Sequence, residues 1–192
     1  MNFYISDLHL GHSKALEYDD RPFCTVEEQT NVVIERWNET VGSRDHVYIL
    51  GDMFWDNNLI YIMKELNGIK HLILGNHDRV NAAFPIYFKS IDTMIKIKDT
   101  GRTVTLCHYP VAHWEGADRG WVHLYGHIHK SRDSRPFLEY KHQMLRRDLP
   151  YECYNVGCML PYMDFTPRTL DYIIEMGKDW EESQWKKMCL DE

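Results

Sequence analysis

Five short apolar runs along the chain each end in an Asp, Asn or His residue. Polar residues follow the runs at 2–5, 46–50, 72–74, 103–107 and 121–125. The third run, 72–74, is short and unbroken, which predicts a strand that is buried on both faces. Because ligands bind beyond the carboxyl ends of strands in open α/β sheets, the repeated ending predicts one shared site.

The turn after the third run has three functional side chains in consecutive positions, in the sequence Gly75-Asn76-His77-Asp78. We predict that the chain turns sharply at Gly75 with a positive φ, which glycine adopts at no steric cost. An amide oxygen, an imidazole and a carboxylate offer a metal ligand, an acid–base group and an orienting group. Taken alone, the stretch is equally compatible with a polar turn after a core strand.

Helical signals occupy the intervals between the first three runs. Thr25 followed by Glu28 is a capping box for a helix that Gly42 ends. A second helix is predicted over 58–67, with an apolar stripe that stops at Gly68. This order of strands and helices favours helices packed on a largely parallel sheet.

A second sheet is predicted in the later part of the chain. Apolar and polar residues alternate over 91–98, and a turn at 99–102 leads into the run 103–107, which together predict a β-hairpin. Further strands are predicted at 121–125 and 151–156.

Residues 130–150 are polar and predict an irregular loop, and a loop of this length is usually functional or disordered. The pair Thr166-Pro167 predicts the start of a helix that reaches about Met176. The charged stretch 179–190 predicts a further helix docked on the outside.

The composition of the chain indicates a globular protein of one domain. The 192 residues are 44% hydrophobic, which is enough to bury a core and fits one domain, 1–192. No apolar run approaches the roughly 18 residues that span a bilayer, and no secretory signal precedes the first strand, so a cytoplasmic protein is expected. The five cysteines form no Cys-x-x-Cys pair and are expected to be reduced thiols.

The formal net charge of −7 argues against a protein that coats long nucleic acid, because such proteins carry a basic surface. The charge is compatible with a small phosphate substrate, since bound metal cations would invert its sign locally.

The polar strand endings form a combined pattern: Asp7-x-His9, Gly51-Asp52, Gly75-Asn76-His77-Asp78, His108 and Gly126-His127-x-His129. In residues and order, this pattern resembles the calcineurin-like metallophosphoesterases. Arg21-Pro22-Phe23 and Asn155-Val156-Gly157 are similar to the small single-domain members found in bacteria and phages. The resemblance implies an α/β fold of two stacked mixed β-sheets flanked by helices.

The same resemblance implies a binuclear metal centre. Its first cation would be held by Asp7, His9, Asp52 and His129, and its second by Asp52, Asn76, His108 and His127. Asp52 would bridge, since a carboxylate can bind one cation with each oxygen. Such a mixture of carboxylate and imidazole suits Mn, Fe, Co, Ni or Zn.

His77 follows a predicted ligand and would donate a hydrogen bond or a proton to the substrate. Many family members carry an orienting Asp three residues after the bridging one, and Trp55 stands in that place here. Either Asp56 or the adjacent Asp78 could orient His77, and Asp78 is taken as a catalytic candidate with it.

The implied activity is hydrolysis of phosphomonoesters or phosphodiesters by a metal-bound hydroxide, with a small nucleotide or cyclic nucleotide as the preferred substrate. The alternatives are a nuclease and a non-catalytic binding scaffold of the same fold. His12, Arg21, Arg79, Trp114 and Trp121 are further candidates for the substrate cleft. The basic loop 130–150 is expected to read the substrate through residues such as Arg132 and Arg135.

Overall fold

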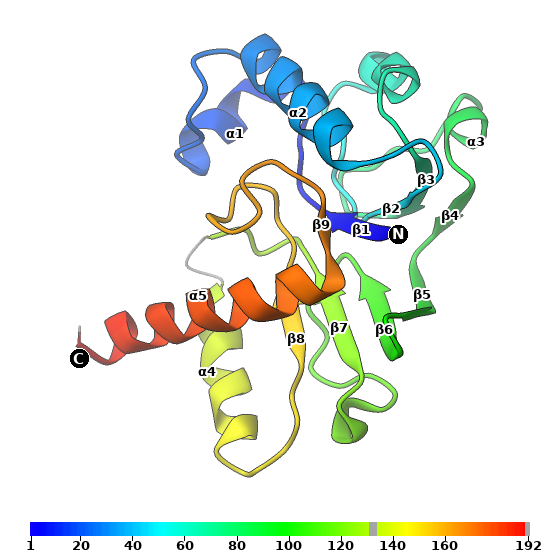
Figure 1. Ribbon diagram of the computed structural model, residues 1–192. Helices are drawn as coiled ribbons and strands as arrows, with labels where there is room; N and C mark the ends of the chain where they lie inside the picture. The colour runs from blue at the N-terminus through cyan, green and yellow to red at the C-terminus, as the bar shows by residue number, and fades with distance from the viewer. Residues whose placement is uncertain (131–133, 191–192) are drawn as a thin grey trace.

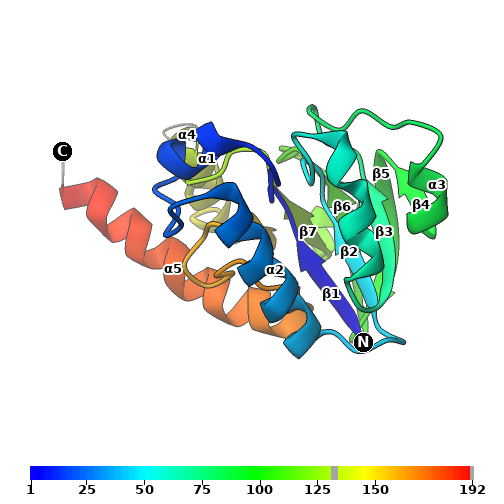
Figure 2. The same cartoon turned by 90° about the horizontal axis from the view of Figure 1, so that it is seen from above.

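The computed structural model describes residues 1–130 and 134–190. Two mixed sheets lie face to face, with helices outside them (Figures 1 and 2). The first sheet has the order β4-β3-β2-β1-β9, and the second has the order β5-β6-β7-β8. The strands of the first sheet are β1 (Asn2–Ile5), β2 (His46–Ile49), β3 (Ile69–Ile73), β4 (Ser90–Asp92) and β9 (Arg168–Thr169). Those of the second are β5 (Met94–Asp99), β6 (Arg102–Cys107), β7 (Val122–Tyr125) and β8 (Cys153–Asn155).

Parallel pairing gives the two sheets a common polar edge. Strands β1 to β4 are parallel to their neighbours, as are β6, β7 and β8, whereas β9 and β5 join antiparallel at the sheet ends. A parallel bridge between Ser6 and Gly157 joins the end of β1 to the segment after β8. The carboxyl ends of these parallel strands therefore meet at this edge, and the predicted site residues follow five of the strands, β1, β2, β3, β6 and β7.

The core lies between the sheets and beneath the helices. Helix α2 (Val26–Thr40) buries Gln29, Val33 and Trp37, and the Thr25 side chain caps it by accepting from the Glu28 amide at 3.1 Å. The second predicted helix is a 3₁₀ helix, η1 (Asn57–Lys64). The fold class and the paired arrangement of sheets predicted from the sequence are confirmed.

Residues 134–145 correct the prediction of an irregular loop, because they form helix α4 (Ser134–Leu145). The apolar stripe of α4 includes Lys141, a buried cation that hides the helical period in the sequence. Its ammonium donates to the carbonyl of Cys153 at 2.6 Å and pairs with Glu181 at 2.5 Å. Residues 131–133 lie outside the described part of the chain.

The structure also corrects the prediction of two separate C-terminal helices, over 166–176 and 179–190. Thr166 does not open a helix: its hydroxyl donates to the carbonyl of Asp164, and β9 follows. One continuous helix, α5 (Leu170–Leu190), then replaces the two predicted ones and packs along β8, β9 and α4 (Figure 1).

Three shorter helices complete the described fold: α1 (Ser13–Tyr18), α3 (Phe84–Tyr87) and η2 (Ala117–Arg119). Of these, α1 lies in the loop after β1, where the sequence suggested no helix, and it forms one wall of the site. The cysteines are free thiols, and Cys107 is buried in β6. Among the described residues, each helix is either too short or too polar to span a membrane.

Candidate metal centre

Five predicted metal ligands have left-handed backbone conformations. The φ angles of Asp7, His9, Asp52, His127 and His129 are 58°, 48°, 53°, 71° and 46°. Positive φ is uncommon for residues other than glycine and costs about 1–3 kcal/mol per residue. The strand ends therefore turn sharply at the predicted ligands, and such strain is typical of functional sites.

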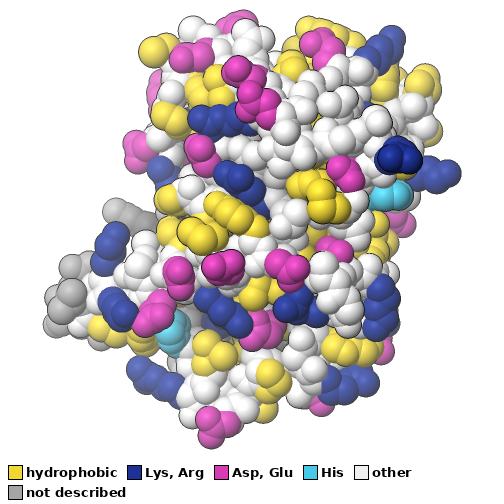
Figure 3. Space-filling view, viewed as in Figure 1, with side chains coloured by type: hydrophobic (Ala, Val, Ile, Leu, Met, Phe, Trp, Pro, Cys, Tyr) yellow, Lys and Arg dark blue, Asp and Glu magenta, His cyan; other side chains and the backbone are white. Residues whose placement is uncertain are grey.

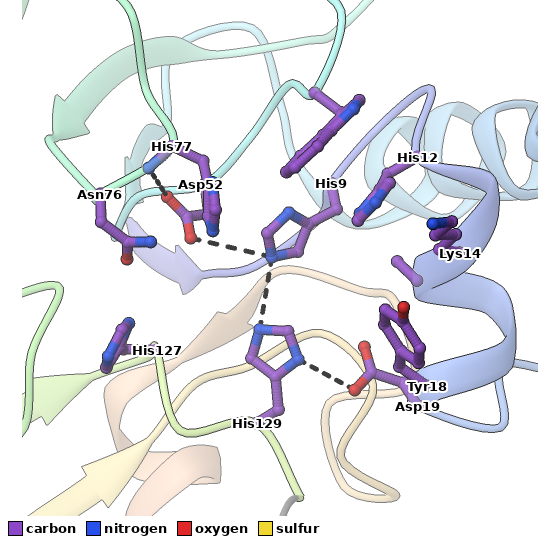
Figure 4. A pocket seen from close by; sticks show the side chains of 12 residues that line it. His9, His12, Lys14, Tyr18, Asp19, Asp52, Asn76, His77, His127 and His129 are labelled. Carbon is purple, nitrogen blue, oxygen red and sulfur yellow. Dashed lines mark hydrogen bonds and ion pairs between the residues drawn. The ribbon is translucent and has the colours of Figure 1, made fainter.

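The first group of ligand atoms comes from both sheets. Asp7 and His9 follow β1, His129 follows β7, and their ligand atoms lie within 4.8 Å of one another. Nε2 of His129 is 3.6 Å from Oδ1 of Asp7 and 3.3 Å from Nε2 of His9. Figure 4 shows the two imidazoles facing each other across the centre.

The second group shares Asp7 and adds Asp52 and His108, both buried. Oδ2 of Asp52 is 3.5 Å from Nε2 of His108 and 3.8 Å from Nε2 of His9, so it lies between the two groups. Oδ1 of Asp52 accepts from the His77 amide at 2.9 Å. Oδ2 is thus the oxygen that faces both groups, whereas the sequence suggested one oxygen for each cation.

Asn76 and His127 complete the predicted set less directly. Oδ1 of Asn76 is 3.0 Å from Nε2 of His108. The ring of His127 lies 5.1 Å from that of His108, and its amide donates to both oxygens of Asp7 at 3.1 and 3.2 Å. The structure therefore brings all seven predicted ligands to one edge.

Hydrogen bonds outside the centre fix the tautomers of two histidines. Nδ1 of His108 donates to the carbonyl of Leu50 at 2.7 Å, and Nδ1 of His129 donates to Oδ1 of Asp19 at 2.9 Å. In a neutral ring, Nε2 is then left as an acceptor in each case. Such support from carboxylates and carbonyls is the usual arrangement behind metal-binding histidines.

Arg21 holds Asp19 in place and is buried. Its guanidinium donates to Oδ2 of Asp19 at 2.8 and 3.0 Å and to the carbonyls of Leu8 and Asp7 at 2.7 and 2.9 Å. Arg21 therefore ties the loop after β1 to the carboxylate behind His129 and does not line the cleft. Asp19 was not among the residues predicted from the sequence, although the Asp19-x-Arg21 spacing in the first loop is visible there.

Three glycines allow the strand ends to approach each other. A Cβ atom at Gly75 would lie 2.2 Å from Oδ1 of Asp52, and one at Gly126 would lie 2.4 Å from Oδ2 of Asp7. At Gly51, with φ of 89°, it would lie 2.5 Å from Nδ1 of His108. The expected positive φ at Gly75 is wrong, because only Gly51 among these three has one; Gly75 is required for close approach.

Burial, charge and hydrogen bonding shift the pKa values of three groups in the centre. Burial lowers the pKa of His129, but hydrogen bonds and charge from Asp19 and Asp7 outweigh this effect and raise it to about 10. Burial raises the pKa of Asp7, yet His129 brings it well below its ordinary value. Burial lowers the pKa of His9 to about 3, so that imidazole is neutral.

Asp78 has a different role from the one expected. Its Oδ2 accepts from the amides of Asp52 and Gly75, each at 2.8 Å, and its Oδ1 accepts from the Met53 amide at 3.2 Å. The carboxylate joins the loops after β2 and β3 and makes no hydrogen bond to the ring of His77.

The surroundings of His77 are aromatic. The ring of Trp55 lies 5.1 Å from that of His77, and the ring of His12 stacks on Trp55 at 3.8 Å with an interplanar angle of 6°. Asp56 caps η1 by accepting from the Asn58 amide. Within the described residues, no carboxylate therefore accepts from the imidazole of His77, and neither Asp56 nor Asp78 orients it.

The ligand atoms open into a cavity of about 540 Å³. Its walls combine six of the predicted ligand and catalytic side chains with residues of α1 and its surroundings (Figure 4). Besides the centre itself, the wall residues are His12, Lys14, Ala15, Tyr18, Asp19 and Trp55. The expectation that His12 reaches the site agrees with this geometry, and Lys14 and Tyr18 were missed because α1 was not predicted.

Other sequence candidates lie elsewhere. Trp114 is buried in a second core cluster under α4, and Trp121 lies beneath the cations of Lys98 and Arg119. Arg135 belongs to α4, where it pairs with Glu139 at 3.1 Å, and is absent from the cavity wall. Arg132 lies outside the described residues.

Comparison with known proteins yields relatives without an assigned activity. No protein-family model matches the chain. An uncharacterized protein of Methanocaldococcus jannaschii is 28% identical over 179 residues, which cover 91% of this chain and 89% of that protein. The crystal structure of a protein of unknown function from Aquifex aeolicus has a TM-score of 0.70 at 23% identity, covering 92% and 98% of the two chains. The two proteins therefore share a fold.

A phage protein provides the family assignment. The Gene 66 protein of Mycobacterium phage D29 is 30% identical over 157 residues, which cover 66% of this chain and 77% of the phage protein. The chain belongs to the same family as this Gene 66 protein.

Proposed function

We propose that this chain is a metal-dependent phosphoesterase that uses two divalent cations to hydrolyse small phosphomonoesters or phosphodiesters. One observation carries the proposal. Oxygens of Asp7, Asp52 and Asn76 converge with Nε2 of His108 and His129, and both rings already donate through Nδ1. A cluster of acceptors at 3.0–3.6 Å requires cations or protons between its members.

The residues fit divalent transition metals. We assign the first cation to Asp7, His9, Asp52 and His129, and the second to Asp52, Asn76, His108 and His127. Carboxylate and imidazole ligands favour Mn, Fe, Co, Ni or Zn. When bound, a pair of such cations neutralises phosphoryl oxygens and lowers the pKa of a coordinated water.

The chain's own groups then hold and protonate the substrate. His77 is exposed, lines the cavity next to the ligand Asn76, and would donate a hydrogen bond or proton to the leaving oxygen. Its backbone is fixed by Oδ1 of Asp52, while its ring is held by contact with Trp55 and His9. Lys14 on the opposite wall would attract an anionic ester.

A small nucleotide or cyclic nucleotide is the preferred substrate class. The net charge is −7, and acidic and basic side chains are interspersed over the face in Figure 3. Proteins that track long nucleic acid present a continuous basic surface instead. A cavity of about 540 Å³ is large enough for a small organic ligand.

The proposal is tested with 4-nitrophenyl phosphate and bis(4-nitrophenyl) phosphate in the presence of Mn²⁺, using the Asp52→Asn variant as a comparison. The variant keeps the volume of the side chain but loses the charge between the two groups. We expect turnover by the wild type, and loss of both turnover and one bound cation in the variant, with an unchanged circular dichroism spectrum. Equal metal content and equal turnover in the two proteins would contradict the assignment, and a wild type that binds metal without turnover would be a binding scaffold.

A further inference from the structure

A second cavity adjoins the metal centre on the side of His77. Its volume is about 350 Å³, and it is lined by Trp55, Asp56, Asn57, His77 and Arg79. His77 and Trp55 also line the larger cavity, so these two side chains stand between the spaces. In Figure 4, His77 lies across the centre from Lys14 and Tyr18, so the second cavity extends the site in a new direction.

Arg79 gives this second cavity a free cation. Among the described residues, none forms a hydrogen bond or ion pair with its guanidinium, and the residue is exposed. The backbone of Arg79 is held in place, because its carbonyl accepts from Nδ2 of Asn57 at 2.7 Å. The acidic neighbour Asp56 is engaged as the cap of η1. A guanidinium offers a planar pair of donors that matches the oxygens of a phosphate.

The position of His77 decides which part of a substrate would enter. A group that protonates the leaving oxygen lies beside the leaving group, so the leaving group departs past His77 toward Arg79. We propose that the substrate is a phosphodiester whose leaving group carries a phosphate of its own, which Arg79 binds. This inference rests on the proposed function, and it favours a nucleotide leaving group over a small alcohol.

The proposed hydrolysis consumes only the phosphodiester and one water molecule. Water adds its oxygen to the phosphorus of the diester, the bond from phosphorus to the leaving oxygen breaks, and that oxygen takes a proton. The products are a phosphomonoester and a free hydroxyl on the nucleotide that left. The terminal phosphate bound by Arg79 takes no part in bond making or breaking.

The test compares three substrates with the same scissile diester: the dinucleoside monophosphate TpT, pTpT with a 5′-terminal phosphate, and TpTp with a 3′-terminal phosphate. We expect a lower KM for at least one phosphorylated form. Its products should be two thymidine monophosphates, because the phosphorylated nucleoside must be the one that leaves. Thymidine together with thymidine bisphosphate would mean that the unphosphorylated nucleoside left, and would overturn the inference.

Substitution of Arg79 tests whether this residue causes the preference for a terminal phosphate. In Arg79→Gln, the ratio of kcat/KM for the preferred phosphorylated form to that for TpT should fall about tenfold, mainly through KM. The control is Arg119→Gln, an exposed arginine stacked on Trp121 and outside both cavities, which should keep the ratio. An unchanged ratio in Arg79→Gln would overturn the inference. If the metal-loaded wild type cleaves neither TpT nor an aryl phosphomonoester or phosphodiester, the proposed function itself fails.

Discussion

Oδ1 of Asp19 accepts a hydrogen bond from Nδ1 of His129 at 2.9 Å, across 110 positions in the sequence. The bond turns Nε2 of His129 toward Asp7 and His9, and Arg21 fixes the carboxylate from behind. Loss of such outer partners typically lowers metal affinity about 10–100-fold. We therefore expect Asp19→Ala to weaken the first cation by that factor, measured by calorimetric titration with Mn²⁺.

Asp19→Ala leaves the guanidinium of Arg21 buried without its carboxylate partner, which can destabilise the fold. The double variant Asp19→Ala with Arg21→Met removes both charges and should show the same loss of affinity. Asp118→Ala, at an exposed position of helix η2, is the control and should bind as the wild type does. Wild-type affinity in the folded double variant would refute the role of Asp19.

Metal binding should release protons. Burial lowers the pKa of His129, but Asp19 and Asp7 raise it to about 10, above its ordinary value of 6.5. The stabilisation of the metal-free fold by this proton is therefore complete below pH 6.5 and is lost as the pH rises through about 10. At pH 8 the first cation must displace the proton.

Calorimetric titration with Mn²⁺ at pH 8, in buffers of different ionisation enthalpy, measures the number of protons released. We expect about one proton from His129 in the wild type, and about one fewer in His129→Gln than in the wild type. Proton release that is identical in the two proteins would show that His129 is not the source.

Substitutions of the adjacent residues His77 and Asp78 should have different effects, the first on turnover and the second on stability. His77→Asn should keep both metals and lose about 10²–10⁴-fold in turnover, with a smaller loss for nitrophenyl esters, whose leaving group needs no proton. Asp78→Asn should instead lower the free energy of unfolding by about 1–3 kcal/mol, since its carboxylate accepts three backbone amides. Denaturant unfolding, metal content and turnover are measured on both variants. If His77→Asn loses bound metal in proportion to its activity, His77 is a metal ligand and not an acid.

Gly75 should be intolerant of a methyl group for reasons of space alone. A Cβ there meets Oδ1 of Asp52 at 2.2 Å, so Gly75→Ala should displace Asp52 and reduce metal content, at a cost of about 1–3 kcal/mol in stability. At Gly42 the added Cβ meets only the side chain of Asp45, at 3.1 Å, so Gly42→Ala is the matched control. Elemental analysis of both variants is the measurement, and normal metal content in Gly75→Ala would refute the clash.

The sequence predicted most of the candidate site because strand ends have a strong signature. An apolar run that stops at Asp, Asn or His reveals both the strand and the edge where its polar residues meet, as for Asp7, Asp52 and His108. Side-chain direction was not predictable in this way. The neighbouring position of Asp78 suggested a role beside His77, whereas its carboxylate turns back toward the amides of Asp52 and Gly75.

Buried charge explains the larger errors in the fold. Helix α4 was missed because Lys141 occupies its apolar face, where the pairing with Glu181 of α5 offsets the cost of burial. Asp19 and Arg21 were likewise separated from the motifs by the unpredicted helix α1. In both cases a long-range partner, invisible in a local pattern, determines the structure.

Ester hydrolysis should require two cations at this edge of the sheets. Turnover of bis(4-nitrophenyl) phosphate by the metal-stripped protein, measured as Mn²⁺ is added stepwise at protein concentrations above the dissociation constants, tests it most directly. We predict no turnover without metal and a plateau at two equivalents per chain. Turnover in the stripped protein, a plateau at one equivalent, or no turnover at saturating metal would contradict the account.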